Sequence, residues 1–231
     1  MEVFLVSGTN ADSIRTNTSL LLAFGLKLLG RETVYIQLAG RDEQPVLTGA
    51  MPAPFATAWF PAIDRPPSSA AIWDWISQSA AAEAVVVDLA VSAFDHGWIA
   101  DPAFRILVPM ATGPAEVERA ARDFHAIAGA LVPSGLVLPW ILPVGWPPAM
   151  EPSDFEPILN RAMSRFRLPA PSSDRIIPPG GILTFDIRSA PPVVDGRITL
   201  SPKLATAAEG IAYAMLRATG SAQVPGPTDA F

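Results

Sequence analysis

The stretch from residue 2 to residue 40 constrains the fold of this chain more than any other. It predicts a strand at residues 3–6, a polar loop at 7–16, an apolar helix at 16–29 and a second strand at 33–37. An aliphatic run that breaks into a polar loop and restarts as a helix is how a phosphate-binding β–α–β unit begins. The stretch therefore predicts an α/β fold with the frame of a nucleotide site in its first loop.

The loop itself lacks the glycines that phosphate binding needs. In a phosphate loop, glycines let backbone N–H groups close around the phosphates, while a lysine and the helix N-terminus supply positive charge. Here Gly8 alone remains, Ile14 brings a β-branched side chain to the ligand side, and Asp12 adds a carboxylate that repels a triphosphate. We interpret the loop as a nucleotide site that has lost its chemistry. The alternative is an ordinary strand-to-helix turn that never bound phosphate.

Composition narrows the function classes. The chain has 231 residues, 50% of them hydrophobic and 16% charged, which suits one α/β domain with a sizeable core. The absence of cysteine excludes disulfides, thiolate metal sites and cysteine nucleophiles, and it fits a cytoplasmic protein. A net charge of −6 argues against nucleic-acid binding.

Neither an export signal nor a membrane span is expected. The N-terminus lacks the basic flank and long apolar core of a signal peptide. Residues 128–150 carry no charge, but five prolines interrupt them, which argues against a spanning helix.

The rest of the chain alternates between strands and helices. Strands are predicted at 56–60, 84–89, 105–109, 135–142, 174–177 and 183–185, and helices at 70–79, 113–129, 152–166 and 203–218. This order implies a single three-layer domain over residues 1–219, with a mostly parallel sheet covered on both faces. Residues 220–231, rich in proline and glycine, are expected to form a flexible tail.

One acidic residue follows a continuous apolar run. Asp88 ends the run Ala84-Val85-Val86-Val87, a pattern typical of a buried parallel strand whose carboxyl end carries a polar group. In a phosphate-loop enzyme such an acid organises the magnesium ion. Its alternative role is that of a helix cap or a solvated loop carboxylate.

Taken in this order, nearly the whole chain resembles the ParA/MinD family of deviant Walker-type P-loop ATPases, which position plasmids, chromosomes, division sites and polar machinery. Members open with a strand, the loop Lys-Gly-Gly-x-Gly-Lys-Thr, a leucine- and alanine-rich helix, Gly-(Lys/Arg)-x-Val and a second strand. The segments that match are residues 20–30, Arg31, Val34, Tyr35, Asp88 and residues 105–109. The resemblance implies a P-loop NTPase fold.

The departures fall where nucleotide chemistry would be. By position, Asn10 stands for the family's signature lysine and Arg15 for its phosphate-binding lysine, while the loop glycines are replaced by Ala11, Asp12 and Ile14. Arg15 keeps the charge, but a planar guanidinium is no close substitute for a compact ammonium. Losses at several parts of one site favour lost catalysis.

What remains of the site is short. Thr16 matches the family's magnesium-binding hydroxyl and Asp88 its acid, so the resemblance implies residual nucleotide-binding positions at Asn10, Arg15, Thr16 and Asp88 and metal positions at Thr16 and Asp88 if Mg-nucleotide binds. No catalytic residue is assigned. Arg15 could equally be a solvated residue at the helix start, and Thr16 simply a good helix-start residue.

The leading hypothesis is a non-catalytic or weakly active ParA/MinD-like protein. It would act in the cytoplasm as an adaptor in partitioning, positioning or DNA-transfer machinery, with no cofactor. The family's dimerisation implies a homodimer or a heterodimer with an active paralogue. The alternative is a working ATPase that binds Mg-ATP or ADP through a rearranged loop, in plasmid or chromosome partition.

Overall fold

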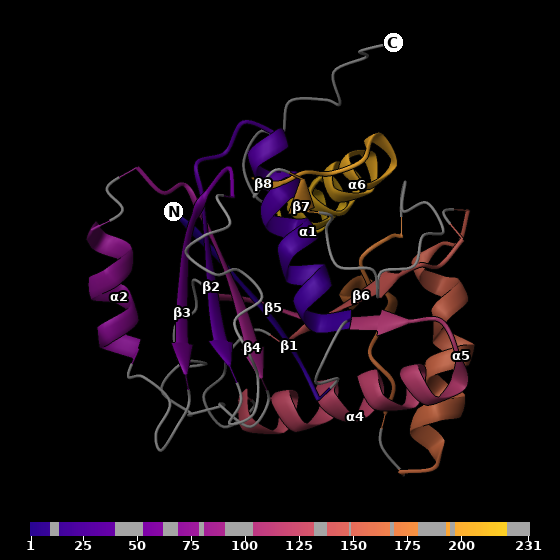
Figure 1. Ribbon diagram of the computed structural model, residues 1–231. Helices are drawn as coiled ribbons and strands as arrows, with labels where there is room; N and C mark the ends of the chain where they lie inside the picture. The colour runs from indigo at the N-terminus through magenta and orange to yellow at the C-terminus, as the bar shows by residue number, and fades with distance from the viewer. Residues whose placement is uncertain are drawn as a thin grey trace.

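A six-stranded sheet runs through the computed structural model, and all its neighbouring strands are parallel (Figure 1). The strand order is β3-β2-β4-β1-β5-β6. The strands are β1 (Glu2–Gly8), β2 (Thr33–Ala39), β3 (Ala56–Pro61), β4 (Ala84–Ala90), β5 (Phe104–Ala111) and β6 (Trp140–Val144). The α/β class and the mostly parallel sheet expected from the sequence are therefore confirmed.

The structure describes residues 1–9, 14–39, 53–61, 69–78, 81–90, 104–131, 138–147, 149–166, 169–179, 193–194 and 197–220. Asn10 and the neighbouring loop positions 11–13 lie outside these ranges, as do the strand expected at 183–185 and residues 221–231 of the expected tail. The division into a domain and a flexible tail stays a prediction.

Helices cover both faces of the sheet. On one face lie α1 (Ile14–Leu28) and α6 (Pro202–Ala218), drawn in indigo and yellow in Figure 1, and the other face carries α2 (Ser69–Gln78), α4 (Pro114–Leu131) and α5 (Pro152–Ser164). Alternate residues of β1 serve the two sides, with Val3 and Leu5 in one core cluster and Phe4 and Val6 in the other. This alternation explains why the buried strands read as unbroken apolar runs.

Two helices far apart in sequence make the closest packing on the first face. Gly25 of α1 lies so near α6 that a Cβ added to it would sit 1.9 Å from the carbonyl oxygen of Ala208 and 2.8 Å from the Cβ of Ala212. Because no side chain fits at this position, glycine lets the two helix backbones come together. The C-terminal helix thus packs directly on the helix that follows the first strand.

Two expected strands need correction. Among the described residues, the strand expected at 135–142 is β6, which begins at Trp140, since Pro139 has no N–H for a ladder hydrogen bond. Residues 135–137 lie outside the described ranges. The strand expected at 174–177 is instead a 3-10 turn, η3 (Ser173–Arg175), followed by one bridge from Ile176 to Ile141. The hydroxyl of Ser172 donates to the carboxylate of Asp174, a local bond that favours a turn over a strand.

A short antiparallel pair, β7 (Val193–Val194) and β8 (Arg197–Ile198), precedes α6. Among the helices that the structure describes, none combines the length and the apolar character required to cross a bilayer.

Candidate functional site

The first turn of α1 and the carboxyl half of β4 meet where the sequence places the nucleotide site. Asp88 pairs in register with Val6 of β1 and Gln37 of β2, so it lies in the middle of the sheet. Its side chain belongs to the face covered by α1, because Val86, two residues earlier, packs in the α1 and α6 cluster. Parallel register and helix placement therefore bring residues about seventy positions apart into contact.

Hydrogen bonds connect Arg15, Thr16 and Asp88 in one network. Arg15 Nε donates to Asp88 Oδ1 at 2.5 Å, and the Thr16 hydroxyl donates to Asp88 Oδ2 at 2.7 Å. Three of the four residues expected at the site are thus brought together, and the fourth, Asn10, lies outside the described residues. The basic group and the acid for which the resemblance implied contacts to a nucleotide bind each other.

The network is buried. The side chains of Arg15 and Asp88 are 1% and 0% exposed, and Thr16 is also buried. The alternative that Arg15 is a solvated residue at the helix start is therefore wrong. A buried guanidinium needs a charged partner, and Asp88 provides it.

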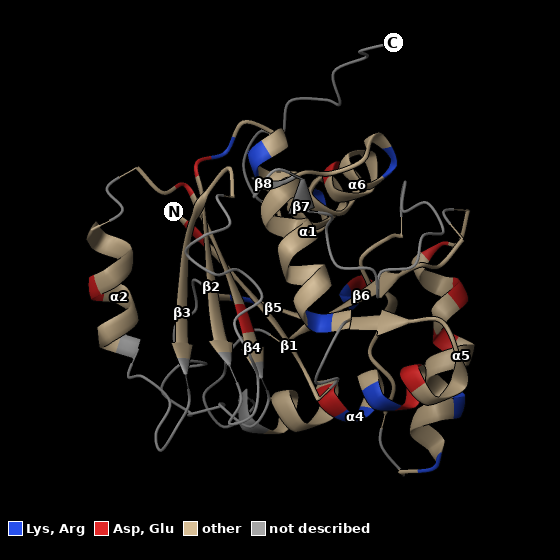
Figure 2. Ribbon diagram, viewed as in Figure 1, with Lys and Arg blue, Asp and Glu red and all other residues tan. Residues whose placement is uncertain are grey.

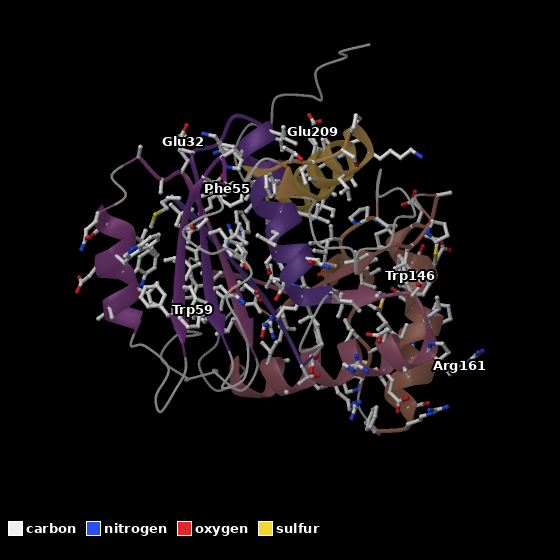
Figure 3. All side chains as sticks on the ribbon, viewed as in Figure 1. Glu32, Phe55, Trp59, Trp146, Arg161 and Glu209 are labelled. Atoms are coloured by element: carbon white, nitrogen blue, oxygen red, sulfur yellow. The ribbon has the colours of Figure 1, made fainter. Side chains whose placement is uncertain are left out.

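Tyr35 completes the site, and the sequence analysis did not give it a role there. Its hydroxyl donates to Asp88 Oδ2 at 3.2 Å from the neighbouring strand β2. Its ring lies 6.4 Å from the ring of Phe55, which in turn makes an edge contact of 4.9 Å with Phe24 of α1 (Figure 3). A sequence signal for this role did exist. Residues two apart on a strand face the same side of the sheet, so Tyr35 lies on the same side as Gln37, the residue paired with Asp88.

A second polar contact fixes the point where the loop leaves β1. Thr9 donates its backbone N–H to Asp123 Oδ2 at 2.8 Å, and its hydroxyl lies 2.9 Å from Oδ1. Asp123 comes from α4, on the opposite face of the sheet from α1. Burial raises the pKa of the Asp123 carboxyl, against the opposing effects of the Thr9 hydrogen bonds and of Arg122 and Arg119. No sequence signal predicts this contact, because Asp123 lies within an ordinary amphipathic helix.

A magnesium nucleotide does not fit this arrangement. Both oxygens of Asp88 already accept hydrogen bonds, and the Thr16 hydroxyl is directed at one of them. The guanidinium of Arg15 also places positive charge beside the carboxylate, where a second cation would be repelled. Within the described residues, no group of three or more His, Cys, Asp or Glu side chains could hold a metal ion. As arranged, these residues form an internal cross-link between α1, β2 and β4.

Comparison with known proteins finds a similarity of structure but none of sequence. No protein-family model matches the chain, and no curated protein matches it. Among solved structures, the chain is similar to one from the MinC:MinD cell division protein complex of Aquifex aeolicus. The two share 13% sequence identity, the match covers 97% of this chain and 98% of that one, and the TM-score is 0.48.

Proposed function

We propose that this chain is a non-catalytic ParA/MinD-like protein that acts by binding another protein, as an adaptor in positioning, partitioning or DNA-transfer machinery. The observation that carries the proposal is the buried pair of Arg15 and Asp88, which uses the phosphate-site cation and the magnesium-site acid to hold the fold together. Cytoplasmic location and assembly as a homodimer, or with an active paralogue, belong to the same proposal.

Binding of a nucleotide at this position would cost free energy, because the buried ion pair stands in the way. A nucleotide could enter only if Arg15 and Asp88 separated, and breaking a buried ion pair costs about 3–5 kcal/mol. That cost lowers affinity by roughly two to three and a half orders of magnitude, because each 1.4 kcal/mol is a factor of ten. The loop offers little to offset it, since glycine is absent from positions 10 to 16.

Calorimetric titration with Mg-ATP and Mg-ADP tests this proposal. We expect no binding tighter than about 0.1 mM, at two temperatures so that a vanishing enthalpy cannot hide a complex. Binding tighter than about 0.1 mM that is lost in Arg15→Ala would contradict the proposal. The Arg165→Ala variant is the matched control, because Arg165 is an exposed arginine on the other face of the sheet.

One observation favours the alternative of a working ATPase. Thr16 and Asp88, which would hold magnesium, remain side by side, with 2.7 Å between the hydroxyl and the carboxylate. On this alternative, Arg15→Ala abolishes ATP hydrolysis by the purified protein. Turnover that is absent from the wild type, or unchanged in that variant, removes the mechanism.

A further inference from the structure

The exposed side of α6 borders a groove of about 790 Å³. The buried side of the same helix, which includes Ala208, Ile211 and Met215, packs in the core cluster shared with α1. The groove is lined by the opposite stripe of α6, with Tyr213 at its centre, and by Leu29 and Pro178 from neighbouring segments. Leu28, next to Leu29, is an apolar side chain left 51% exposed. The outer stripe of α6 is therefore a second surface of the helix, half-buried and partly apolar, that faces the groove.

Three charged residues line the groove: Glu151 at the start of α5, and two opposite charges on α6 that lie at equal spacing from Tyr213. Glu209 lies four residues before Tyr213 and Arg217 four residues after it, and all three line the groove. With a rise of 1.5 Å per residue, each charge lies about 6 Å along the helix from Tyr213. Within the described part of the chain, neither Glu209 nor Arg217 has an ion pair or a side-chain hydrogen bond. The charged stripe of α6 is therefore complementary to itself when the helix is reversed.

We propose that this groove is the site where two copies of the chain associate, with the α6 helices antiparallel about a twofold axis at Tyr213. In that arrangement Glu209 of each copy lies level with Arg217 of the other, which gives two intermolecular ion pairs. A parallel arrangement would set like charges against each other and is disfavoured. Gly210 and Ala214, on either side of Tyr213, leave room for the second helix to approach.

Figure 3 labels Glu209 on α6, and Figure 2 shows the charged positions along the helices. Glu209 projects from α6 at the edge of the molecule, on the side opposite α4 (Figure 3). Charged residues are few along α6, so the pair stands out against a mainly uncharged helix (Figure 2). The interface deepens the proposed role in protein binding. The interface includes neither Arg15 nor Asp88. Sedimentation and cross-linking therefore test the interface, while the calorimetric titration tests the proposal on nucleotide binding, and either can fail without the other.

Sedimentation equilibrium on the full chain, at roughly 1–100 µM, measures the association. We expect a dimer whose dissociation constant rises at least about tenfold in Glu209→Arg and in Arg217→Glu, because each reversal creates two repulsive contacts. An equimolar mixture of the two variants should recover the wild-type constant, since one copy then carries both positive charges and the other both negative ones. Asp74→Arg, an exposed acid on α2, is the matched control and should leave the constant unchanged.

A cross-link supplies a measurement that does not depend on charge. The chain has no cysteine, so Tyr213→Cys introduces a single thiol at the proposed twofold axis. Mild oxidation should form a disulfide-linked dimer at least about tenfold faster than in the control Asp74→Cys, because the two thiols face each other only across this interface. A wild type that stays monomeric at 100 µM, single reversals without effect, a mixture that does not recover, or equal cross-linking rates would each overturn the interface.

Discussion

At the scale of single residues, the defining feature is a buried charge pair. Arg15 and Asp88, for which the resemblance implied contacts to a phosphate and a magnesium ion, bind each other in the structure. The hydroxyls of Thr16 and Tyr35 both donate to Oδ2 of the same carboxylate. Such a pair is well tolerated when complete and strongly destabilising when one member is removed.

A double-mutant cycle tests the structural role of the pair. Asp88→Leu and Arg15→Met should each lower the free energy of unfolding by about 3–5 kcal/mol, because each leaves one buried charge without its partner. Combining Arg15→Met with Asp88→Leu should bring stability back to within about 1 kcal/mol of the wild type or above it, since no charge then remains buried. Urea unfolding measures all four corners of the cycle.

The control for the cycle is an exposed ion pair. Arg165 and Glu118 are 3.3 Å apart, and the Arg165 side chain is 68% exposed. Arg165→Met should therefore change stability by less than about 1 kcal/mol. Single variants at Arg15 and Asp88 that also fall below this value would show that the pair contributes nothing special.

At this scale, the residues that could be predicted from the sequence are those whose roles have a local sequence pattern. Arg15, Thr16 and Asp88 were expected at one site because the resemblance matches them to one loop and one strand end, and parallel strands bring strand ends and helix starts together. Tyr35 and Asp123 were missed, because their roles follow from which face of a strand or helix meets a distant residue. That Arg15 binds Asp88 rather than a ligand could not be predicted, since the preference is decided by burial.

At the scale of elements, the packing of α1 against α6 determines where the C-terminal helix lies. Both helices were predicted from the sequence, but their contact was not. A single glycine in an apolar helix does not indicate which other element packs against it. The short strand expected at 174–177 failed for the opposite reason. There a local bond from Ser172 to Asp174 outweighed an apolar pattern too short to be decisive.

Two glycine substitutions separate close packing from helix propensity. Gly25→Ala should destabilise the protein by at least about 2 kcal/mol, because its Cβ would overlap the Ala208 carbonyl and force the helices apart. Gly129→Ala, on the exposed side of α4 with nothing within 4 Å of the added Cβ, should stabilise it by about 0.4–1 kcal/mol. Thermal and urea unfolding of the two variants give the comparison. Equal effects of the same sign would mean that α1 and α6 are not held at this distance.

At the scale of the whole molecule, one sheet joins two core clusters, and polar contacts across it connect the layers. The Thr9 and Asp123 contact joins the end of β1 to α4 on one side, while the Arg15 and Asp88 pair joins β4 to α1 on the other. Both contacts flank the loop between β1 and α1. The overall stability of the chain should therefore respond to the ionisation of a group that the sequence analysis did not single out.

Asp123 gives this response a definite sign. Burial raises its pKa above the ordinary value of 3.8, so between 3.8 and the raised value the folded chain holds a proton that the unfolded chain has lost. The folded state thus binds more protons in this window, and the contribution of Asp123 to stability is greatest at low pH and falls as pH rises through the folded pKa. Asp123→Asn cannot ionise but can still accept the Thr9 N–H.

The difference in unfolding free energy between wild type and Asp123→Asn, measured in urea at closely spaced pH values, isolates this effect from all other carboxyl groups. The wild type should lose stability relative to Asp123→Asn as pH rises from 3.8, and the difference should stop changing above the folded pKa of Asp123. A difference that instead grows in favour of the wild type would mean that the ionised carboxylate is stabilised by Thr9, Arg119 and Arg122 more than burial penalises it. In that outcome, the start of the loop is held by a charge in the same way as the site beside Asp88.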